Sequence, residues 1–187
     1  RLPHTVEEAR AVAGLVRGQV YLEEEATLER LRGAMGDCRL VHLAAHGEFR
    51  PDTPLVSGMA LQGGWLTTLD IFSLRLRAAL VTLSACETGQ SLVGGGDELL
   101  GLMRALLYAG AAARVLSLWT VEDRCTAGLM AAMYGRLAAG RTKGAALRAA
   151  QIDLLEGSAA GDDLRRHPYF WAPFFLVGET GELYHRE

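Results

Sequence analysis

The hydrophobic positions of this chain alternate between the spacing of helices and the spacing of buried strands. Apolar residues three or four positions apart predict amphipathic helices. Five segments have this spacing: Thr5–Val16, Ala26–Met35, Asp97–Ala109, Thr126–Ala139 and Thr142–Leu155. Short uninterrupted apolar runs predict buried strands. Four segments have this form: Arg39–Ala45, Ala79–Ser84, Ala113–Trp119 and Phe174–Val177.

Capping residues mark the ends of two of the predicted helices. Thr5 and Glu8 have the spacing of a capping box at the start of the first helix. Gly110 directly follows the apolar helix Asp97–Ala109 and is expected to cap its carboxyl end.

The order of the elements predicts the fold class. Met59–Leu61 and Trp65–Leu66 flank the pair Gly63-Gly64, and we expect a small β-hairpin there. The other strands alternate with helices, which favours βαβ units. The predicted class is α/β: an α/β/α sandwich with a mostly parallel central sheet flanked by helices, plus the small hairpin. In such sheets, functional residues lie just beyond the carboxyl ends of the strands.

Composition limits the classes of function that fit this chain. Its 187 residues, half of them apolar, fit a single domain over residues 1–187 that can bury a core. The 19 basic and 22 acidic residues give a net charge of −3, which argues against nucleic acid as the main ligand. No apolar run approaches the roughly 20 residues that a bilayer span needs, so no membrane partner is expected.

Residue usage also indicates a cellular setting. Cys38, Cys86 and Cys125 are too few and too scattered for a disulfide framework, so we expect a reducing, cytoplasmic setting. Lys143 is the only lysine, and together with the abundant alanine this indicates a bacterial coding bias. The chain starts at Arg1 without a methionine, and we expect a domain cut from a longer protein.

A histidine and a cysteine follow the first two predicted parallel strands. His46 and Gly47 come directly after Arg39–Ala45, and Cys86 comes shortly after Ser84. If these strands are neighbours, the imidazole and the thiol meet at one sheet edge, as a cysteine nucleophile requires. A nearby imidazole favours the thiolate and can later protonate the leaving group. The backbone N–H groups of Gly47 and Cys86 would then form an oxyanion hole.

Each of these residues also has a structural explanation. A lone cysteine after a strand is more often a small buried residue than a nucleophile, and a histidine there is often only hydrogen-bonded. The pairing favours catalysis, because two independent strands must both end in matching chemistry. His42 and His46 are four apart, but they lack further ligands, so no metal site is expected.

Motifs along nearly the whole chain resemble one family. They include VHLAAHG at 41–47, LSACETG at 83–89, LWTVED at 118–123 and HPYFW at 167–171. Their order and spacing resemble the CHAT domain, a caspase-like cysteine peptidase family related to caspases and separase. Ser84 stands where caspases have glutamine, and an extra residue precedes Gly89, so the chain does not resemble a caspase proper.

The resemblance implies a caspase-like fold and a cysteine-type endopeptidase that needs no cofactor. It implies that His46 is the acid/base and Cys86 the nucleophile, with Gly47 and Cys86 as backbone donors of the oxyanion hole. It also implies a protein or peptide substrate, and a regulatory domain or partner such as helical repeats.

Acidic residues at the same edge are candidates for the substrate pocket. Glu87 follows Cys86, and Asp123 follows the third predicted strand. An acidic pocket would favour a basic residue before the cleaved bond. Alternatively, Asp123 caps the helix starting near Thr126 or holds the Trp119 turn, which is the role we favour, and Glu87 braces its loop.

Two rival functions stay open. One is a catalytically silent caspase-like interaction or scaffold domain, which would have no chemical need for His46 and Cys86. The other is a thiol-dependent hydrolase of small amides, for which the sequence contains no recognisable small-ligand motif. The sequence therefore favours the endopeptidase.

Overall fold

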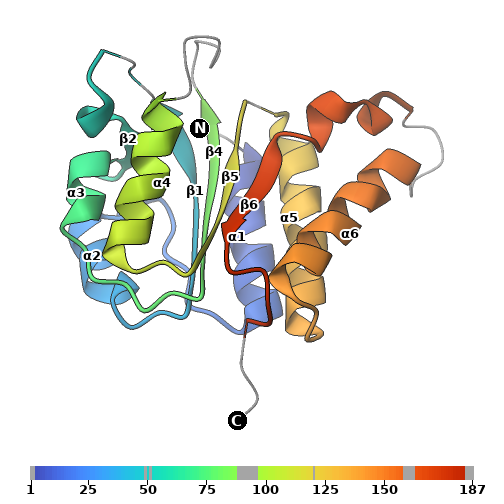
Figure 1. Ribbon diagram of the computed structural model, residues 1–187, viewed down its shortest axis with the longest axis horizontal. Helices are drawn as coiled ribbons and strands as arrows, with labels where there is room; N and C mark the ends of the chain where they lie inside the picture. The colour runs from blue at the N-terminus through green and yellow to red at the C-terminus, as the bar shows by residue number, and fades with distance from the viewer. Residues whose placement is uncertain are drawn as a thin grey trace.

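Helices and strands alternate along the chain in the computed structural model (Figure 1). The structure describes residues 3–48, 50, 52–87, 97–119, 121–157 and 163–183. The α-helices are α1 (Pro3–Val16), α2 (Leu28–Met35), α3 (Thr68–Phe72), α4 (Asp97–Ala109), α5 (Asp123–Ala138) and α6 (Lys143–Glu156). The strands are β1 (Leu40–Glu48), β2 (Gly58–Leu61), β3 (Gly64–Thr67), β4 (Leu80–Glu87), β5 (Ala113–Ser117) and β6 (Phe174–Gly178). Short 3-10 helices lie at Glu23–Glu25, Pro54–Val56, Asp163–Arg166 and Pro168–Phe170.

A six-stranded sheet forms the centre, with the strand order β3-β2-β1-β4-β5-β6. The pairs β1–β4 and β4–β5 are parallel, and every pair that includes β2, β3 or β6 is antiparallel. The predicted α/β class is confirmed, but the sheet is mixed rather than mostly parallel. After β5, two helices in succession return the chain to the carboxyl end of β5, so β6 runs the opposite way.

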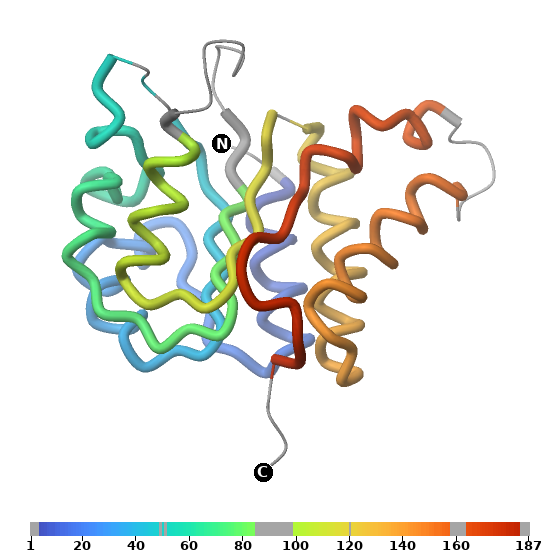
Figure 2. The backbone as a smooth tube through the Cα atoms, viewed as in Figure 1, coloured from blue at the N-terminus to red at the C-terminus, as the bar shows by residue number. Residues whose placement is uncertain are grey.

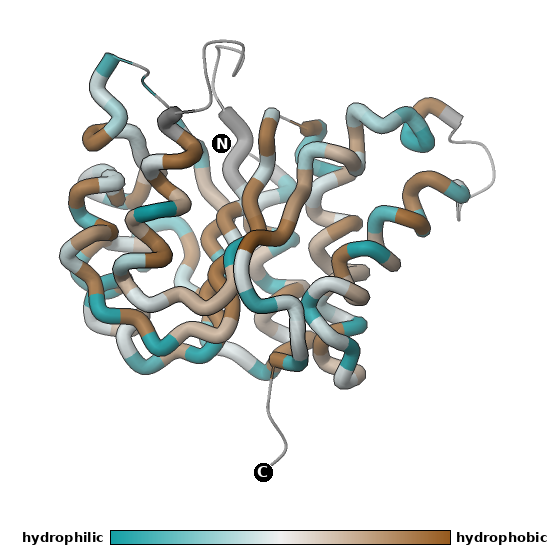
Figure 3. The backbone as a smooth tube through the Cα atoms, viewed as in Figure 1, coloured by the Kyte–Doolittle hydropathy of each residue, from teal (hydrophilic) through white to brown (hydrophobic). Residues whose placement is uncertain are grey.

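Helices cover both faces of the sheet, as Figures 1 and 2 show. On one face α2, α3 and α4 enclose a core that includes Leu83, Leu102 and Leu106. On the other, α1, α5 and α6 enclose a core around Leu129 and Tyr134. The central strands are largely hydrophobic in Figure 3. In the described ranges, no helix combines the length and the apolar character that a bilayer crossing requires.

The helix α4 has the bounds that its sequence predicts. Gly110 follows it with a φ of +109°, a conformation that glycine adopts without strain. A Cβ at this position would lie 2.3 Å from the Leu76 carbonyl oxygen. Only glycine therefore fits this turn into β5.

Two predicted helix starts are wrong. The helix α1 begins at Pro3, so Thr5 lies inside it, and Glu8 is buried instead of capping the helix. The helix α5 begins at Asp123, earlier than the predicted start at Thr126. An acidic residue in the first turn interacts favourably with the helix dipole, which is consistent with the earlier start.

Candidate active site

His46 and Cys86 are paired residues on neighbouring parallel strands. The register of β1 and β4 pairs His46 with Cys86 and Gly47 with Glu87. Neighbouring strands lie about 4.8 Å apart, so the two backbones meet near the carboxyl ends of their strands. The expectation that these strands are neighbours is thus met. The side chains of Cys86 and Glu87 lie outside the described part of the chain, as does the glycine-rich segment that follows.

His46 lies on the sheet face that α1, α5 and α6 cover. Successive residues of a strand belong to opposite faces. Val41 and Leu43 belong to the core on the α4 side, so His42 and His46 lie on the other face.

The His46 ring is half-buried, and its Nδ1 nitrogen is buried without a hydrogen-bond partner among the described residues. Gly47 beside it is buried as well. Unpartnered buried polar atoms are rare in folded proteins, and a catalytic role is one recognised reason for them. The position is therefore suited to a group that exchanges a proton with a bound molecule.

A buried polar network lies beneath His46 on the same face of β1. His42 Nε2 is 2.9 Å from Glu8 Oε1 on α1, and His42 Nδ1 is 3.2 Å from the Tyr134 hydroxyl on α5. That hydroxyl donates to Thr82 Oγ1 on β4 at 2.8 Å. The network therefore joins both strands of the candidate site to the helices that cover them.

These contacts explain why His42 is buried here, with no need for a metal bound to its ring. Both of its ring nitrogens have protein partners, and the described residues contain no group of three or more His, Cys, Asp or Glu that could hold a metal ion. Burial raises the pKa of Tyr134 above its usual range despite the hydrogen bond to Thr82, so the phenol stays protonated. Sequence reasoning missed this network, although an acid at Glu8 on a buried helix face was an available signal.

Asp123 is the first residue of α5, whose amino end follows β5 at the edge where the parallel strands end (Figure 1). The predicted cap at Asp123 is wrong, because the residue lies inside the helix. Its neighbour Glu122 accepts a hydrogen bond from the Cys125 thiol at 3.3 Å and lies 4.0 Å from the Arg165 guanidinium. Part of the acidic charge at this edge is thus compensated.

Cys38 and Cys125 have structural surroundings. Cys125 is 2% exposed, and a thiol buried in this way reacts slowly. Cys38 is half-buried, packs against the core and donates to the Ala34 carbonyl at 3.1 Å.

Aromatic residues before β6 pack beside the same edge. Trp119 and Tyr169 are stacked with ring centroids 6.4 Å apart, and the Trp119 indole donates to the Tyr169 carbonyl at 2.9 Å. The Trp171 indole donates to the Arg166 carbonyl at 3.0 Å, and His167 Nδ1 accepts from the Tyr169 N–H at 3.2 Å. These contacts are typical of an aromatic cluster that packs next to a strand.

Comparison with known proteins gives one family over almost the whole chain. The family model described as the CHAT domain matches residues 1–179. Human tetratricopeptide repeat protein 28 is 28% identical over 220 aligned positions, which cover 97% of this chain and 9% of the human protein. The mouse protein of the same name is 27% identical, and its alignment also covers 97% of this chain and 9% of the mouse protein. The chain spans about a tenth of the length of these relatives, and a bacterial origin stays a prediction.

Proposed function

Since the chain belongs to the CHAT domain family, we propose that it is a cysteine endopeptidase that cleaves peptide bonds through a His46–Cys86 dyad. The observation that carries the proposal is the register of β1 and β4, which pairs these two residues near the ends of their strands. The proposed architecture is caspase-like, and the proposed setting is cytoplasmic.

In the first half of the proposed reaction, His46 takes the thiol proton of Cys86, and the sulfur attacks the carbonyl carbon of the substrate. The carbonyl oxygen becomes an oxyanion that accepts hydrogen bonds from the N–H groups of Gly47 and Cys86, each worth about 3 kcal/mol. The imidazolium then gives its proton to the leaving amine as the C–N bond breaks. The acyl group remains on sulfur as a thioester.

In the second half, a water molecule attacks the thioester carbonyl while His46 accepts a proton from the water. The C–S bond breaks, the acid product leaves, and the imidazolium returns its proton to the sulfur of Cys86. One water is consumed for each peptide bond, and the dyad is regenerated.

Two further observations support a working dyad. The Nδ1 nitrogen of His46 is buried without a partner in the described part of the chain, so it is available for proton exchange. The Glu8–His42–Tyr134–Thr82 network joins β1 to β4 through α1 and α5, which limits relative movement of the two strands. Catalytic groups need such support from their neighbours.

The proposed substrate is a protein or peptide, with Glu87 and Asp123 as candidates for contact with it. Glu87 is the last residue of β4, and Asp123 begins the helix that follows β5 at the same edge. Carboxylates there favour a basic side chain on the acyl side of the cleaved bond.

A helical-repeat domain or partner is the proposed regulator. The human and mouse relatives are named as tetratricopeptide repeat proteins. Such repeats stack helix pairs into extended surfaces that bind other proteins.

The same names favour a second candidate function, a catalytically silent caspase-like interaction domain. Such a domain would use its surface for binding and would not need the thiol of Cys86. The two functions therefore predict different effects when the Cys86 thiol is removed.

Cleavage of a peptide library by purified protein tests the proposal. The wild type is expected to cleave, and Cys86→Ala and His46→Ala are each expected to lower kcat/KM by at least about a thousandfold. Cys38→Ala is the matched control and should keep full activity, because Cys38 only packs against the core. Absence of cleavage by the wild type would favour the interaction domain, and cleavage by Cys86→Ala would contradict the proposed dyad.

A further inference from the structure

The outer surface of α4 exposes a stripe of large apolar side chains. Leu107 and Tyr108 are 59% and 66% exposed, and Leu100 is 40% exposed. Leu100 and Leu107 are seven positions apart, so they lie on one face of the helix. Tyr108 contacts Phe72 of α3, with 5.7 Å between the ring centroids. A contiguous exposed apolar area of this kind is typical of an interaction surface.

One arginine lies within this stripe. Arg104 is four positions after Leu100 and three positions before Leu107, so it belongs to the same face of α4. Its side chain is exposed. A partner that covers the two leucines must therefore also accept this guanidinium.

Two more arginines flank the stripe at the carboxyl end of α4. Arg75 and Arg77 are both exposed, and the Leu76 N–H between them donates to the Ala109 carbonyl of α4 at 2.6 Å. The Arg75 guanidinium lies 5.9 Å from the centroid of the Tyr108 ring. Positive charge and apolar surface therefore share one area of the molecule.

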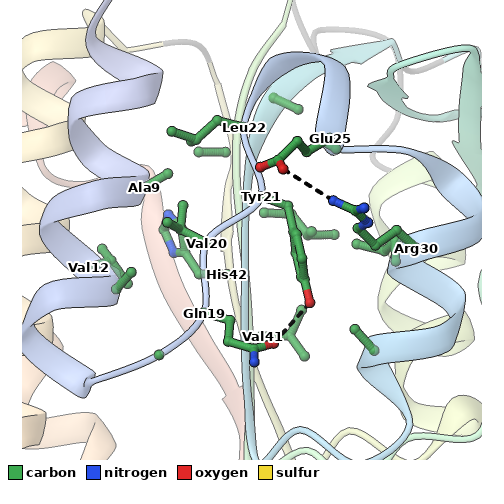
Figure 4. Close-up of a pocket in the computed structure, with 18 of the residues that line it drawn as sticks. Ala9, Val12, Gln19, Val20, Tyr21, Leu22, Glu25, Arg30, Val41 and His42 are labelled. Carbon is green, nitrogen blue, oxygen red and sulfur yellow. Dashed lines mark hydrogen bonds and ion pairs between the residues drawn. The ribbon is translucent and has the colours of Figure 1, made fainter.

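These three guanidinium groups form no ion pair with a carboxylate in the described part of the chain. Arginines elsewhere on the surface do have acidic partners. Arg30 pairs with Glu25 at 3.5 Å, beside the cavity between α1 and α2 (Figure 4), and Arg136 pairs with Asp153 at 2.6 Å. We call the following exposed residues the α4 patch: Arg75, Arg77, Leu100, Arg104, Leu107 and Tyr108.

We propose that the α4 patch binds an amphipathic α-helix of a partner protein, with acidic residues beside the apolar stripe of that helix. Leu100 and Leu107 are about 10.5 Å apart along α4, which matches two apolar side chains seven positions apart on the partner. A carboxylate between those side chains would pair with Arg104, and such charge-assisted hydrogen bonds are strong. The binding is independent of the chemistry at His46 and Cys86.

The charges of the α4 patch argue against two other occupants. A second copy of this chain would bring the same three positive charges toward one another, which is unfavourable. A membrane would place the Arg104 guanidinium among the leucines that insert into lipid, and three basic residues add only weak attraction to an anionic surface. A protein helix can instead present a carboxylate at this point.

Binding of three designed peptides to the 187-residue chain tests this proposal. The acidic probe is acetylated and amidated AELEALEAELEALE, whose leucines recur three and four positions apart. The matched probes, AQLQALQAQLQALQ and AKLKALKAKLKALK, keep the leucines and replace every glutamate. The acidic peptide is expected to bind at least about tenfold more tightly than the glutamine peptide, and the lysine peptide is expected to bind most weakly. Equal affinity of the acidic and glutamine peptides overturns the proposal.

A charge reversal within the stripe shows whether the peptides bind there. Arg104→Glu is expected to reverse the order, so that the lysine peptide binds more tightly than the acidic peptide. The same three peptides are used for each variant, so differences in helicity between the peptides cancel. Arg10→Glu is the matched control, because it changes the net charge equally at an exposed position on α1, which covers the other face of the sheet. Equal effects of the two variants would mean that only net charge matters, and this overturns the proposal.

The apolar contribution is tested by Leu107→Gln, which is expected to weaken binding of the acidic peptide at least about tenfold. Leu164→Gln is the control, because Leu164 is 74% exposed and lies outside the α4 patch. Equal affinities of these two variants overturn the proposal. A dimer of the wild type that Leu107→Gln dissociates, or phosphatidylserine vesicles that displace the acidic peptide, would assign the patch to a second copy or to a membrane and also overturn it.

Discussion

Glu8 and His42 are 34 positions apart in the sequence and form a buried pair, with 2.9 Å between Oε1 and Nε2. The two side chains are each 5% exposed. This pair joins α1 to β1, and the contact of His42 with Tyr134 extends the connection to α5. The position of the strand that carries His46 thus depends on residues outside the proposed dyad.

Glu8→Ala is expected to lower the free energy of unfolding by about 1–3 kcal/mol, because it leaves the Nε2 nitrogen of the buried His42 side chain without its hydrogen-bond partner. Urea denaturation measures this change. Glu7→Ala is the matched control on the same helix, since the Glu7 side chain is 73% exposed, and it should change stability by less than about 0.5 kcal/mol. Equal losses for the two variants would contradict a stabilising role for the buried pair.

Gly58 in β2 approaches β3 closely. A Cβ on Gly58 would lie 2.2 Å from the Leu66 carbonyl oxygen, so Gly58→Ala is expected to destabilise the protein by about 1–3 kcal/mol. Gly64→Ala in the same hairpin is the control, because a Cβ there meets nothing within 4 Å. Thermal unfolding measures both variants, and an unchanged Tm for Gly58→Ala would refute the close approach.

Asp70 forms a capping box with Thr67 at the start of α3 and pairs with Arg32 of α2. Burial alone would raise the pKa of Asp70, but the hydrogen bonds from Thr67 and the charge of Arg32 outweigh it and lower this pKa below the usual 3.8. A carboxyl group with a lowered pKa stabilises the fold above its unfolded pKa. This contribution is lost as the pH falls through the folded pKa.

Asp70→Asn is therefore expected to cost about 1 kcal/mol near neutral pH and almost nothing once the pH is well below the lowered folded pKa, where the wild-type carboxyl is also neutral. Urea denaturation at several pH values measures the difference between variant and wild type. Asp37→Asn, at an exposed position, is the control and should differ little from the wild type throughout. A difference for Asp70→Asn that persists in acid would contradict the lowered pKa.

Features that depend on neighbouring residues could be predicted from the sequence. The periodicity of Asp97–Ala109 was sufficient to predict α4, and the glycine after it was sufficient to predict where α4 ends. The hairpin around Gly63 followed from its turn residues. His46 and Cys86 were expected to meet at one edge if their strands were neighbours, and the pairing of β1 with β4 meets this condition.

Features that depend on distant contacts could not be predicted. The direction of β6 depends on how α5 and α6 pack, which the local pattern of Phe174–Gly178 does not encode. Glu8 fits a capping box locally, and only the packing of α1 on β1 reveals its partner His42.

Asp123→Asn tests the proposed preference for a basic residue before the cleaved bond. Loss of this carboxylate is expected to lower kcat/KM for a substrate with arginine there by at least about tenfold relative to one with alanine. Glu122→Gln is the control, because Arg165 already lies 4.0 Å from that carboxylate. If the ratio of kcat/KM for the two substrates is the same in Asp123→Asn as in the wild type, this residue does not contact the substrate.

The dyad itself is tested most directly by alkylation with a peptide-based electrophile, followed by mass spectrometry of each cysteine. Cys86 is expected to react at least about a hundredfold faster than the buried Cys125 and the packed Cys38, because only a thiolate at an accessible site is a good nucleophile. His46→Ala is expected to slow the reaction of Cys86 by about a hundredfold, because the imidazole takes the thiol proton. Similar rates at all three cysteines, or a Cys86 rate that His46→Ala leaves unchanged, would contradict the proposed peptidase.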